Sequence, residues 1–280
     1  MRIFIKLVTT FLLIPYLVVS YGCSNTKIRE EQNPTPPNES TLDQPPLPNP
    51  SISPVSPYWD LSDTDISKVS KNRKLIAFTF DDGPAATLQK IIGVYLHFNA
   101  THPDAPASAT IFCNGKNINE QTLPDLQTAY AAGFELGNHT HNHKNFSLLS
   151  EAETKSEIET SDRLLKKIDG KAVHLLRTPY GSMNDSIRKL ARAPIINWFI
   201  DTLDWTEPSP EEIYSTVWET KSPGVIVLMH DGYDNTVSAL NRLLPDLYDA
   251  GYQVVGVSQM AKAHGCRLLN GGVYTRARQK

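Results

Sequence analysis

The chain has little excess charge of either sign, few cysteines and only one long apolar run. Its formal net charge is -3, and no basic stripe crosses the predicted domain, which argues against a nucleic-acid partner. The apolar run, residues 7–21, is too short and too close to the N-terminus for a membrane-spanning helix. Hydrophobic residues make up 40% of the chain and charged residues 20%, values typical of a globular protein with one sizeable domain or two small ones.

The N-terminus has the features of an export signal. Basic residues precede the apolar run, and the run ends at Gly22-Cys23. This junction is similar to the bacterial lipoprotein signal, in which the cysteine is lipidated and becomes the mature N-terminus, although Ser20 stands where that signal usually has Leu. An ordinary secretory signal and an uncleaved anchor stay open as alternatives. We expect a signal peptide at 1–22, a lipid anchor at Cys23 and a location in the cell envelope, held to a membrane outside the cytoplasm, with secretion as the alternative.

Residues 23–58 are polar and dense in proline, with few large apolar side chains. Such a segment cannot offset its loss of conformational entropy by burial, so we expect a disordered tether between the anchor and the domain. A proline-rich ligand for a protein partner is the competing interpretation, and no feature of the pattern favours it.

Three cysteines allow at most one disulfide once Cys23 is assigned to the lipid anchor. Cys113 and Cys266 are far apart in the sequence, in a compartment that permits oxidation. Cys113 ends an apolar run typical of a core strand, which favours two separate buried thiols. Whether the two pair is left open.

The chain from residue 59 to residue 270 alternates predicted strands with predicted helices, and 271–280 lacks a core pattern and is expected to be a tail. The expected strands are 75–80, 109–113, 134–136, 173–176, 195–200, 225–229 and 252–257. The expected helices are 87–98, 119–132, 150–168, 185–191, 210–220 and 237–250, with capping boxes at Ser150 and Ser209. This alternation predicts an α/β fold with a parallel sheet, closed or nearly closed into a barrel.

Functional residues of such barrels lie at the C-terminal ends of the strands. The first expected strand delivers Asp81 and Asp82 to this end, just before Gly83-Pro84. Neighbouring side chains on an extended backbone point in different directions, so one carboxylate can bind a metal while the other handles a proton. A solvated Asp-Asp-Gly turn would have the same sequence. By the same rule the long segment 99–108, which leads into a strand, belongs to the opposite end and has no catalytic part.

Three histidines follow the expected strand 134–136. His139 and His143 are four residues apart, and one helical turn would place both imidazoles on one side, as two ligands of a single metal ion require. Asp82 would be the third ligand and would leave a position open for water and substrate. His141 is expected to point elsewhere, either supporting the ligands or facing solvent.

Polar residues also follow three further expected strands: Arg177 the first, Asp204 with Trp205 the second, and His230 the third. Arg177 could hold a carboxylate through two parallel hydrogen bonds and keep it ionised. Each residue taken singly has an ordinary structural explanation, but five polar sets directly after five strands indicate one site.

Five motifs carry a resemblance to a known family: Thr-Phe-Asp-Asp-Gly at 79–83, His-Thr-x-x-His at 139–143, Arg-x-Pro-Tyr-Gly at 177–181, Asp-x-x-Asp-Trp at 201–205 and Leu-x-His at 228–230. In this order they resemble the signature of the NodB-type polysaccharide deacetylases, carbohydrate esterase family 4. The resemblance covers residues 74–257, and all five motifs are intact.

The resemblance implies a distorted, incomplete (β/α) barrel of about seven strands and a divalent metal, zinc before cobalt or nickel. It also implies roles for individual residues: Asp82, His139 and His143 as metal ligands, Asp81 as general base, Arg177 orienting Asp81, His230 as general acid held by Asp204, Trp205 and Leu228 lining the pocket for the acetyl methyl, and Tyr180 offering its backbone N–H to the oxyanion.

The expected function is hydrolysis of N-acetyl groups on an acetylated glycan, such as peptidoglycan, a chitin-like polymer or a surface glycan, by a monomer. Two alternatives stay open: an O-acetyl esterase on xylan-type polysaccharide, and a non-catalytic carbohydrate-binding relative. The intact motifs argue against the second. A phosphate-handling metalloenzyme would need further basic residues beside the site, and the sequence lacks them.

Overall fold

The structure is a computed structural model that describes residues 56–278. The signal peptide predicted at 1–22, the anchor Cys23 and the tether as far as residue 55 lie outside the described residues. Among the described residues, no helix has the length and apolar character needed to cross a membrane.

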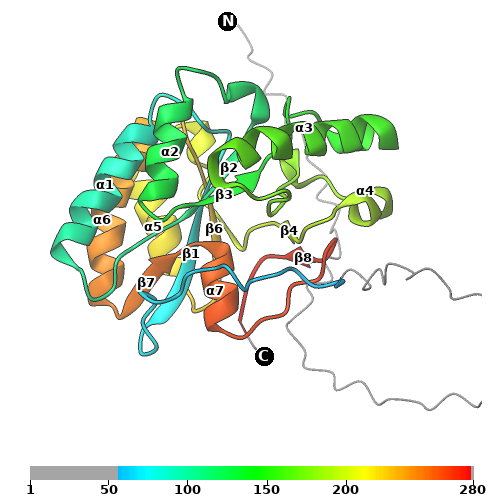
Figure 1. Ribbon diagram of the computed structural model, residues 1–280. Coiled ribbons are helices and arrows are strands. Elements are labelled where there is room, and N and C mark those ends of the chain that lie inside the picture. Colours follow the sequence, from blue (N-terminus) through cyan, green and yellow to red (C-terminus); the bar gives the residue numbers. More distant parts are fainter. Residues whose placement is uncertain (1–55, 279–280) are drawn as a thin grey trace, which may run out of the picture.

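Eight strands and seven α-helices alternate along most of the described chain (Figure 1). The strands are β1 Lys74–Asp81, β2 Thr110–Cys113, β3 Glu135–Asn138, β4 Ile195–Ile196, β5 Ile200–Asp201, β6 Ile226–His230, β7 Tyr252–Val255 and β8 Val273–Tyr274. The helices are α1 Leu88–Thr101, α2 Leu123–Ala131, α3 Glu151–Asp169, α4 Asp185–Leu190, α5 Pro210–Thr220, α6 Asp234–Asp249 and α7 Val257–Ala263. Four 3-10 turns lie between them: η1 Gly115–Asn117, η2 Phe146–Leu148, η3 Pro179–Gly181 and η4 Asp204–Thr206.

β1 is the centre of a parallel sheet with the order β3-β2-β1-β6-β5, and β7 also pairs with β1. Every residue of β1 after Lys74 is buried, which explains why its sequence is a nearly continuous apolar run. In the register between β1 and β6, Asp81 lies opposite His230. The sheet therefore brings the ends of the first and fifth motifs side by side.

On the far side of the barrel, strand pairing is limited to single bridges and two-residue strands. The segment 173–176 contributes only Leu176, which forms single bridges to Asn138 and Ile195. The expected strand 195–200 divides into β4, paired with β8, and β5, paired with β6. The division has a physical cause, because the backbone N–H of Asn197 donates to Tyr274 and that of Phe199 donates to Ile226. The segment thus changes partner midway, and the barrel is distorted and incomplete, as the family resemblance implied.

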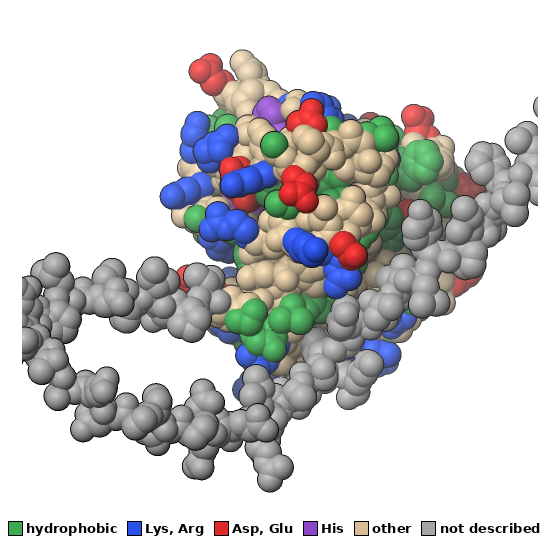
Figure 2. Space-filling model, turned by 90° about the vertical axis from the view of Figure 1, so that its right-hand side faces the viewer, with side chains coloured by type: hydrophobic (Ala, Val, Ile, Leu, Met, Phe, Trp, Pro, Cys, Tyr) green, Lys and Arg blue, Asp and Glu red, His purple; other side chains and the backbone are tan. Residues whose placement is uncertain are grey.

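Helices α1, α2, α5 and α6 lie on one side of β1, and α3 and α4 lie on the other (Figure 1). Both predicted capping boxes are present, at Ser150 of α3 and Ser209 of α5. Lysine and arginine side chains lie among acidic ones on the side of the molecule where α3 and α4 are found (Figure 2). α3 buries Glu157 and Asp162 on its inner face. These two acids therefore face the interior of the protein rather than solvent.

The C-terminal prediction was wrong. Residues 271–278 are not a tail, because Val273 and Tyr274 form β8 and Ala277 is fully buried. A two-residue strand is too short for a periodic apolar pattern, so sequence periodicity could not reveal it. The expected strand 252–257 also ends earlier than predicted, because α7 begins at Val257.

Cys113 and Cys266 are both buried and are not joined in a disulfide, and they belong to different clusters of the hydrophobic core. The expectation of two separate thiols is confirmed.

Candidate active site

The site begins where β1 ends. Asp81 is the last residue of the strand and its side chain is almost fully buried, whereas the Asp82 side chain is 38% exposed. The backbone of Asp82 has φ +68, in the left-handed region that an aspartate adopts only where the surroundings hold it there. This turn of the backbone sends the two adjacent carboxylates to different partners.

His139 and His143 flank a loop rather than one helical turn, so that part of the prediction was wrong. Thr140 and His143 have φ +68 and +57, and these two left-handed residues fold the loop back on itself. The two imidazole rings come to lie 4.9 Å apart between centroids. His141 lies outside this pair, as expected, and it is half-buried rather than solvent-facing.

Three donor atoms converge at the mouth of the barrel. Oδ1 of Asp82 lies 3.6 Å from Nε2 of His139 and 3.4 Å from Nε2 of His143. Asp82, His139 and His143 each offer one ligand atom, and these atoms all lie within 4.8 Å of one another. The three residues predicted as metal ligands are therefore together.

The protonation of these histidines suits a cation. Nδ1 of His139 lies 2.8 Å from the carbonyl oxygen of Arg177, and a carbonyl can only accept, so Nδ1 carries the proton. The lone pair of Nε2 in the neutral ring then points towards the carboxylates. Burial and the neighbouring His139 lower the pKa of His143, which keeps its ring neutral. Two imidazole lone pairs and a carboxylate oxygen facing one point fit a divalent metal such as zinc.

Asp81 faces the donor set but is tied to Arg177. Its Oδ1 accepts a hydrogen bond of 2.7 Å from Nη1 of Arg177, and its Oδ2 lies 3.6 Å from Nε2 of His139. The arginine is fully buried, and its Nε and Nη2 donate to the carbonyl oxygens of Ile196 and Asn197. The expected pair of parallel bonds to Asp81 is not formed, because the other guanidinium nitrogens are used by the backbone. A single bond leaves Oδ2 of Asp81 available.

His230 approaches from the opposite side on β6. Its Nδ1 donates to Oδ1 of Asp204 over 2.7 Å, and Oδ2 of Asp204 accepts from the His230 backbone and from the Thr236 hydroxyl. Burial alone would lower the pKa of His230, but the hydrogen bond that it donates to Asp204 and the charges of Asp81, Asp204 and Asp82 raise the pKa above its ordinary value. Asp204 thus fixes the ring and favours its protonated form.

The three residues predicted to contact substrate lie around this centre. Tyr180 has φ +60, is 68% exposed and packs its ring against that of His143, with centroids 4.8 Å apart. Trp205 directly follows Asp204 on η4 and is 53% exposed. Leu228 is buried on β6 two residues before His230, so both side chains lie on the same face of the strand.

Comparison with known proteins agrees with this arrangement. The profile of the polysaccharide deacetylase family matches residues 68–194. A peptidoglycan-N-acetylglucosamine deacetylase of Bacillus cereus is 33% identical over 205 residues, which are 70% of this chain and 92% of that protein. The chain belongs to the polysaccharide deacetylase family.

Two further relatives are much longer than the region that they share with this chain, which spans less than half of each. Peptidoglycan-N-acetylmuramic acid deacetylase PdaC of Bacillus subtilis is 32% identical over 69% of this chain, and the match spans 40% of its length. A bifunctional xylanase/deacetylase of Pseudobutyrivibrio xylanivorans is 30% identical over 70% of this chain, and the match spans 32% of its length. The solved structure of PdaC has a TM-score of 0.64 with 31% identity and covers 70% of this chain and 93% of that one.

Polar residues that sequence reasoning overlooked support the candidate site from α3. Glu157 accepts hydrogen bonds from the backbone N–H and the side-chain amide of Asn142, over 2.6 and 2.8 Å. The Asn138 amide bridges Asp162 and the backbone N–H of Thr140. One sequence signal could have revealed them: Glu157 and Asp162 are acids at positions of α3 whose spacing predicts burial.

Asn114 and Asn117 were overlooked as well. Asn114 is the first polar residue after the expected strand 109–113, so the strand-end rule applied to it but was not used there. Both asparagine amides donate to Asp82.

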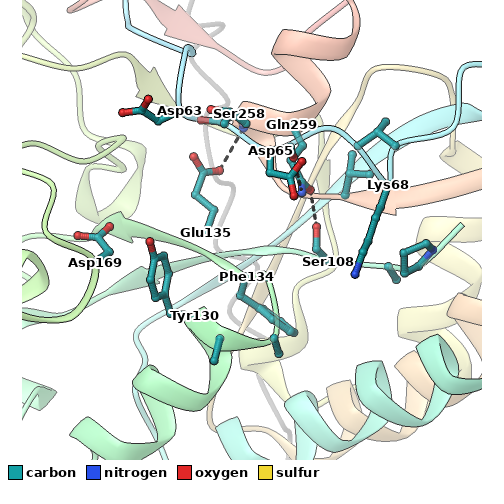
Figure 3. A pocket seen from close by; sticks show the side chains of 18 of the residues that line it. Asp63, Asp65, Lys68, Ser108, Tyr130, Phe134, Glu135, Asp169, Ser258 and Gln259 are labelled. Carbon is teal, nitrogen blue, oxygen red and sulfur yellow. Dashed lines mark hydrogen bonds between the residues drawn. The ribbon is translucent and has the colours of Figure 1, made fainter. Parts of the chain in front are cut away.

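A cavity of about 770 Å³ lies at the other end of the fold (Figure 3). Its lining includes Ser108, which lies just before β2, and Glu135, which is the first residue of β3. The other ends of these two strands lead to Asn114 and His139. Ser108 donates to Gln259, and Glu135 accepts from the backbone of Ser258. None of the residues that line this cavity belongs to the predicted site.

Proposed function

We propose that this chain is a metal-dependent deacetylase that hydrolyses N-acetyl groups of an amino-sugar polymer or oligomer. The observation that carries the proposal is the convergence of three ligand atoms beside a carboxylate held by a buried arginine, with His230 in register with that carboxylate. Peptidoglycan and chitin-like glycans are the substrates we favour, because relatives with these names are 31% to 33% identical.

Asp82, His139 and His143 would hold the metal, with zinc preferred over cobalt and nickel for a site of two imidazoles and one carboxylate. When bound, a zinc ion would polarise the acetyl carbonyl and acidify water. The side chain of Tyr180 packs on His143, which would place the Tyr180 backbone N–H near the reacting carbonyl as a donor to the oxyanion.

Asp81 would act as the general base through Oδ2, because Oδ1 is engaged by Arg177. His230 would act as the general acid. Its Nδ1 donates to Asp204, so Nε2 is the atom that would give a proton to the departing amine. Protonation of this amine matters because an amide anion is a very poor leaving group. Trp205 and Leu228 would bound the space for the acetyl methyl group.

A second candidate is removal of O-acetyl groups from xylan-type polysaccharide, favoured by the 30% identity to the bifunctional xylanase/deacetylase. The same donors and proton carriers would serve an ester as well as an amide.

A further proposal concerns location: the Gly22-Cys23 junction supports a lipid anchor outside the cytoplasm. Radiolabelled palmitate incorporated by the full-length chain and lost in Cys23→Ser would test it.

The test of the function is acetate release by the protein without residues 1–55, stripped of metal and then given zinc. Chitooligosaccharide, peptidoglycan and acetylated xylan should be assayed side by side. We expect zinc-dependent release from an N-acetylated substrate, abolished by His143→Ala and unchanged by His97→Ala, which removes an exposed histidine of α1. Release from xylan alone would replace the first candidate by the second. Glycan binding without release from any substrate would favour a non-catalytic role.

A further inference from the structure

We propose that the turn 114–117, directly after β2, sets the position of the metal ligands: the side chains of Asn114 and Asn117 fix Asp82, and the backbone of the turn fixes the histidine loop. This inference rests on the proposed function and adds positioning residues to it. None of the five sequence motifs includes this turn.

Asn114 acts on the carboxylate itself. Its Nδ2 donates to Oδ1 of Asp82 over 3.0 Å, and this is the oxygen that faces both imidazoles. The backbone N–H of Asn114 donates to the carbonyl oxygen of Gly83 over 2.8 Å, so the residue is anchored beside its target. A hydrogen bond to a ligating carboxylate orients its lone pairs and limits its rotation.

The side-chain oxygen of Asn114 indicates that this residue has a functional role rather than a packing role. Asn114 is 3% exposed, and its Oδ1 has no hydrogen-bond partner among the described residues. A buried acceptor without a partner is unfavourable for folding. An apolar side chain of the same shape would avoid this cost, and the benefit of the amide is its bond to Asp82.

Asn117 acts on the backbone of the same ligand. Its Nδ2 donates to the carbonyl oxygen of Asp82 over 2.8 Å. Asp82 has φ +68, a conformation that is strained for a residue other than glycine, so it requires outside support. The amides of Asn114 and Asn117 thus hold both the carboxylate and the peptide group of Asp82.

The turn also holds the histidines. The backbone N–H groups of Gly115 and Lys116 donate to the carbonyl oxygens of Thr140 and His141, each over 2.9 Å. The contact is close, because a Cβ on Gly115 would lie 2.7 Å from Nδ1 of His141 and 3.2 Å from the backbone of Ser161. One short turn therefore contacts both Asp82 and the loop between the two histidine ligands, and under this proposal it sets the distance between Asp82 and the two imidazoles.

The experiment measures zinc affinity of the whole protein by chelator competition, together with the melting temperature of the zinc-free form. Asn114→Leu keeps the number and branching of the side-chain heavy atoms and removes the donor. We expect about 10-fold to 100-fold weaker zinc binding, with a melting temperature of the zinc-free form that is unchanged or higher. Asn117→Ala, at a half-buried position, should weaken zinc binding in the same direction.

The control is Asn241→Ala, which removes an exposed amide of α6 and should leave zinc affinity unchanged. Zinc affinities of Asn114→Leu and Asn117→Ala within twofold of the unaltered protein would overturn the inference. So would equal losses of stability in the zinc-free and zinc-bound forms, because they would show a purely structural role. The proposed function fails in a different way, namely if zinc binding survives His143→Ala.

Discussion

Asp81 and Asp82 are neighbours in the sequence with different surroundings. Asp81 is buried against Arg177, and Asp82 is partly exposed and faces two imidazoles. A single backbone torsion at Asp82 separates them. Under the proposed function, the buried guanidinium beside Asp81 suits that residue as the base, and the two imidazoles facing Asp82 suit that residue as a metal ligand.

We expect Asp81→Asn to lower kcat by at least 100-fold while zinc stays bound, since general-base catalysis contributes about 100-fold to 10,000-fold. Acetate release and zinc content of the purified variant are the two measurements. Loss of zinc from this variant, with zinc retained in Asp82→Asn, would show that the two roles are exchanged.

The second residue-scale prediction concerns pH. His230 must be protonated to act as an acid, and its pKa is raised, so activity should fall as the pH rises through that raised value. Asp204→Asn removes the negative charge of Asp204, which contributes to the raised pKa of His230. The alkaline limb of the kcat/KM profile should therefore move to lower pH, with a loss of activity of about 100-fold. Asp234→Asn, an exposed change on α6, is the matched control. An unmoved alkaline limb in Asp204→Asn would contradict the assignment.

At the scale of elements, α3 and the segment after it contain a buried charge cluster. His174 lies between Asp162 and Asp169, with Nδ1 2.9 Å from the first carboxylate and Nε2 3.1 Å from the second. Burial alone would lower the pKa of His174, but the hydrogen bonds and charges of the two aspartates raise it. Asp162 also accepts from Asn138, which adjoins the histidine loop.

The raised pKa of His174 has a consequence for stability. A group whose pKa is raised on folding contributes its full stabilisation below its unfolded pKa of about 6.5, and loses it as the pH rises through the folded value. Zinc-free His174→Gln should therefore be less stable than the unaltered protein by about 2 kcal/mol at pH 6, and the difference should shrink at pH 9. Urea unfolding at both pH values measures it. A gap that widens towards pH 9 would show that the ring is neutral in the folded protein.

Most elements could be predicted from the sequence because their signals are local. The apolar run of β1, the capping box at Ser150 and the polar residues after the strands each depend on neighbouring residues. The left-handed conformations of Thr140 and His143 could not be predicted from the sequence. In residues other than glycine such conformations depend on tertiary contacts, such as the hydrogen bond that the Asn142 backbone donates to Glu157. The roles of Asn114 and Asn117 likewise depend on the pairing of β2 with β1.

At the scale of the whole molecule, the C-terminal segment completes the core. Tyr274 is 3% exposed, its hydroxyl accepts from the backbone of Leu269, and it packs with Ile196 and Leu268. The pairing with Ile196 links segments that are far apart in the chain. Loss of these contacts would expose one edge of the core and leave β4 without its partner strand.

We therefore expect a chain ending at Gly272 to lose about 3 kcal/mol or more of unfolding free energy, the cost typical of removing one large buried aromatic side chain. Denaturant titration measures the loss. A chain ending at Arg278 should match the full-length protein. Equal stability of the chain ending at Gly272 would restore the interpretation of this segment as a tail.

β1 comes first among the strands of the chain, yet it pairs with β6 and β7, which come near the end. Contacts between such distant segments require a large loop to close before they contribute, and this slows folding. The apolar run of β1 therefore stays unpaired with β6 and β7 until those strands have been synthesised. During this time its apolar side chains are exposed and can cause aggregation. Refolding rates should consequently be more sensitive to substitutions in β6 and β7 than to substitutions in β2 or β3.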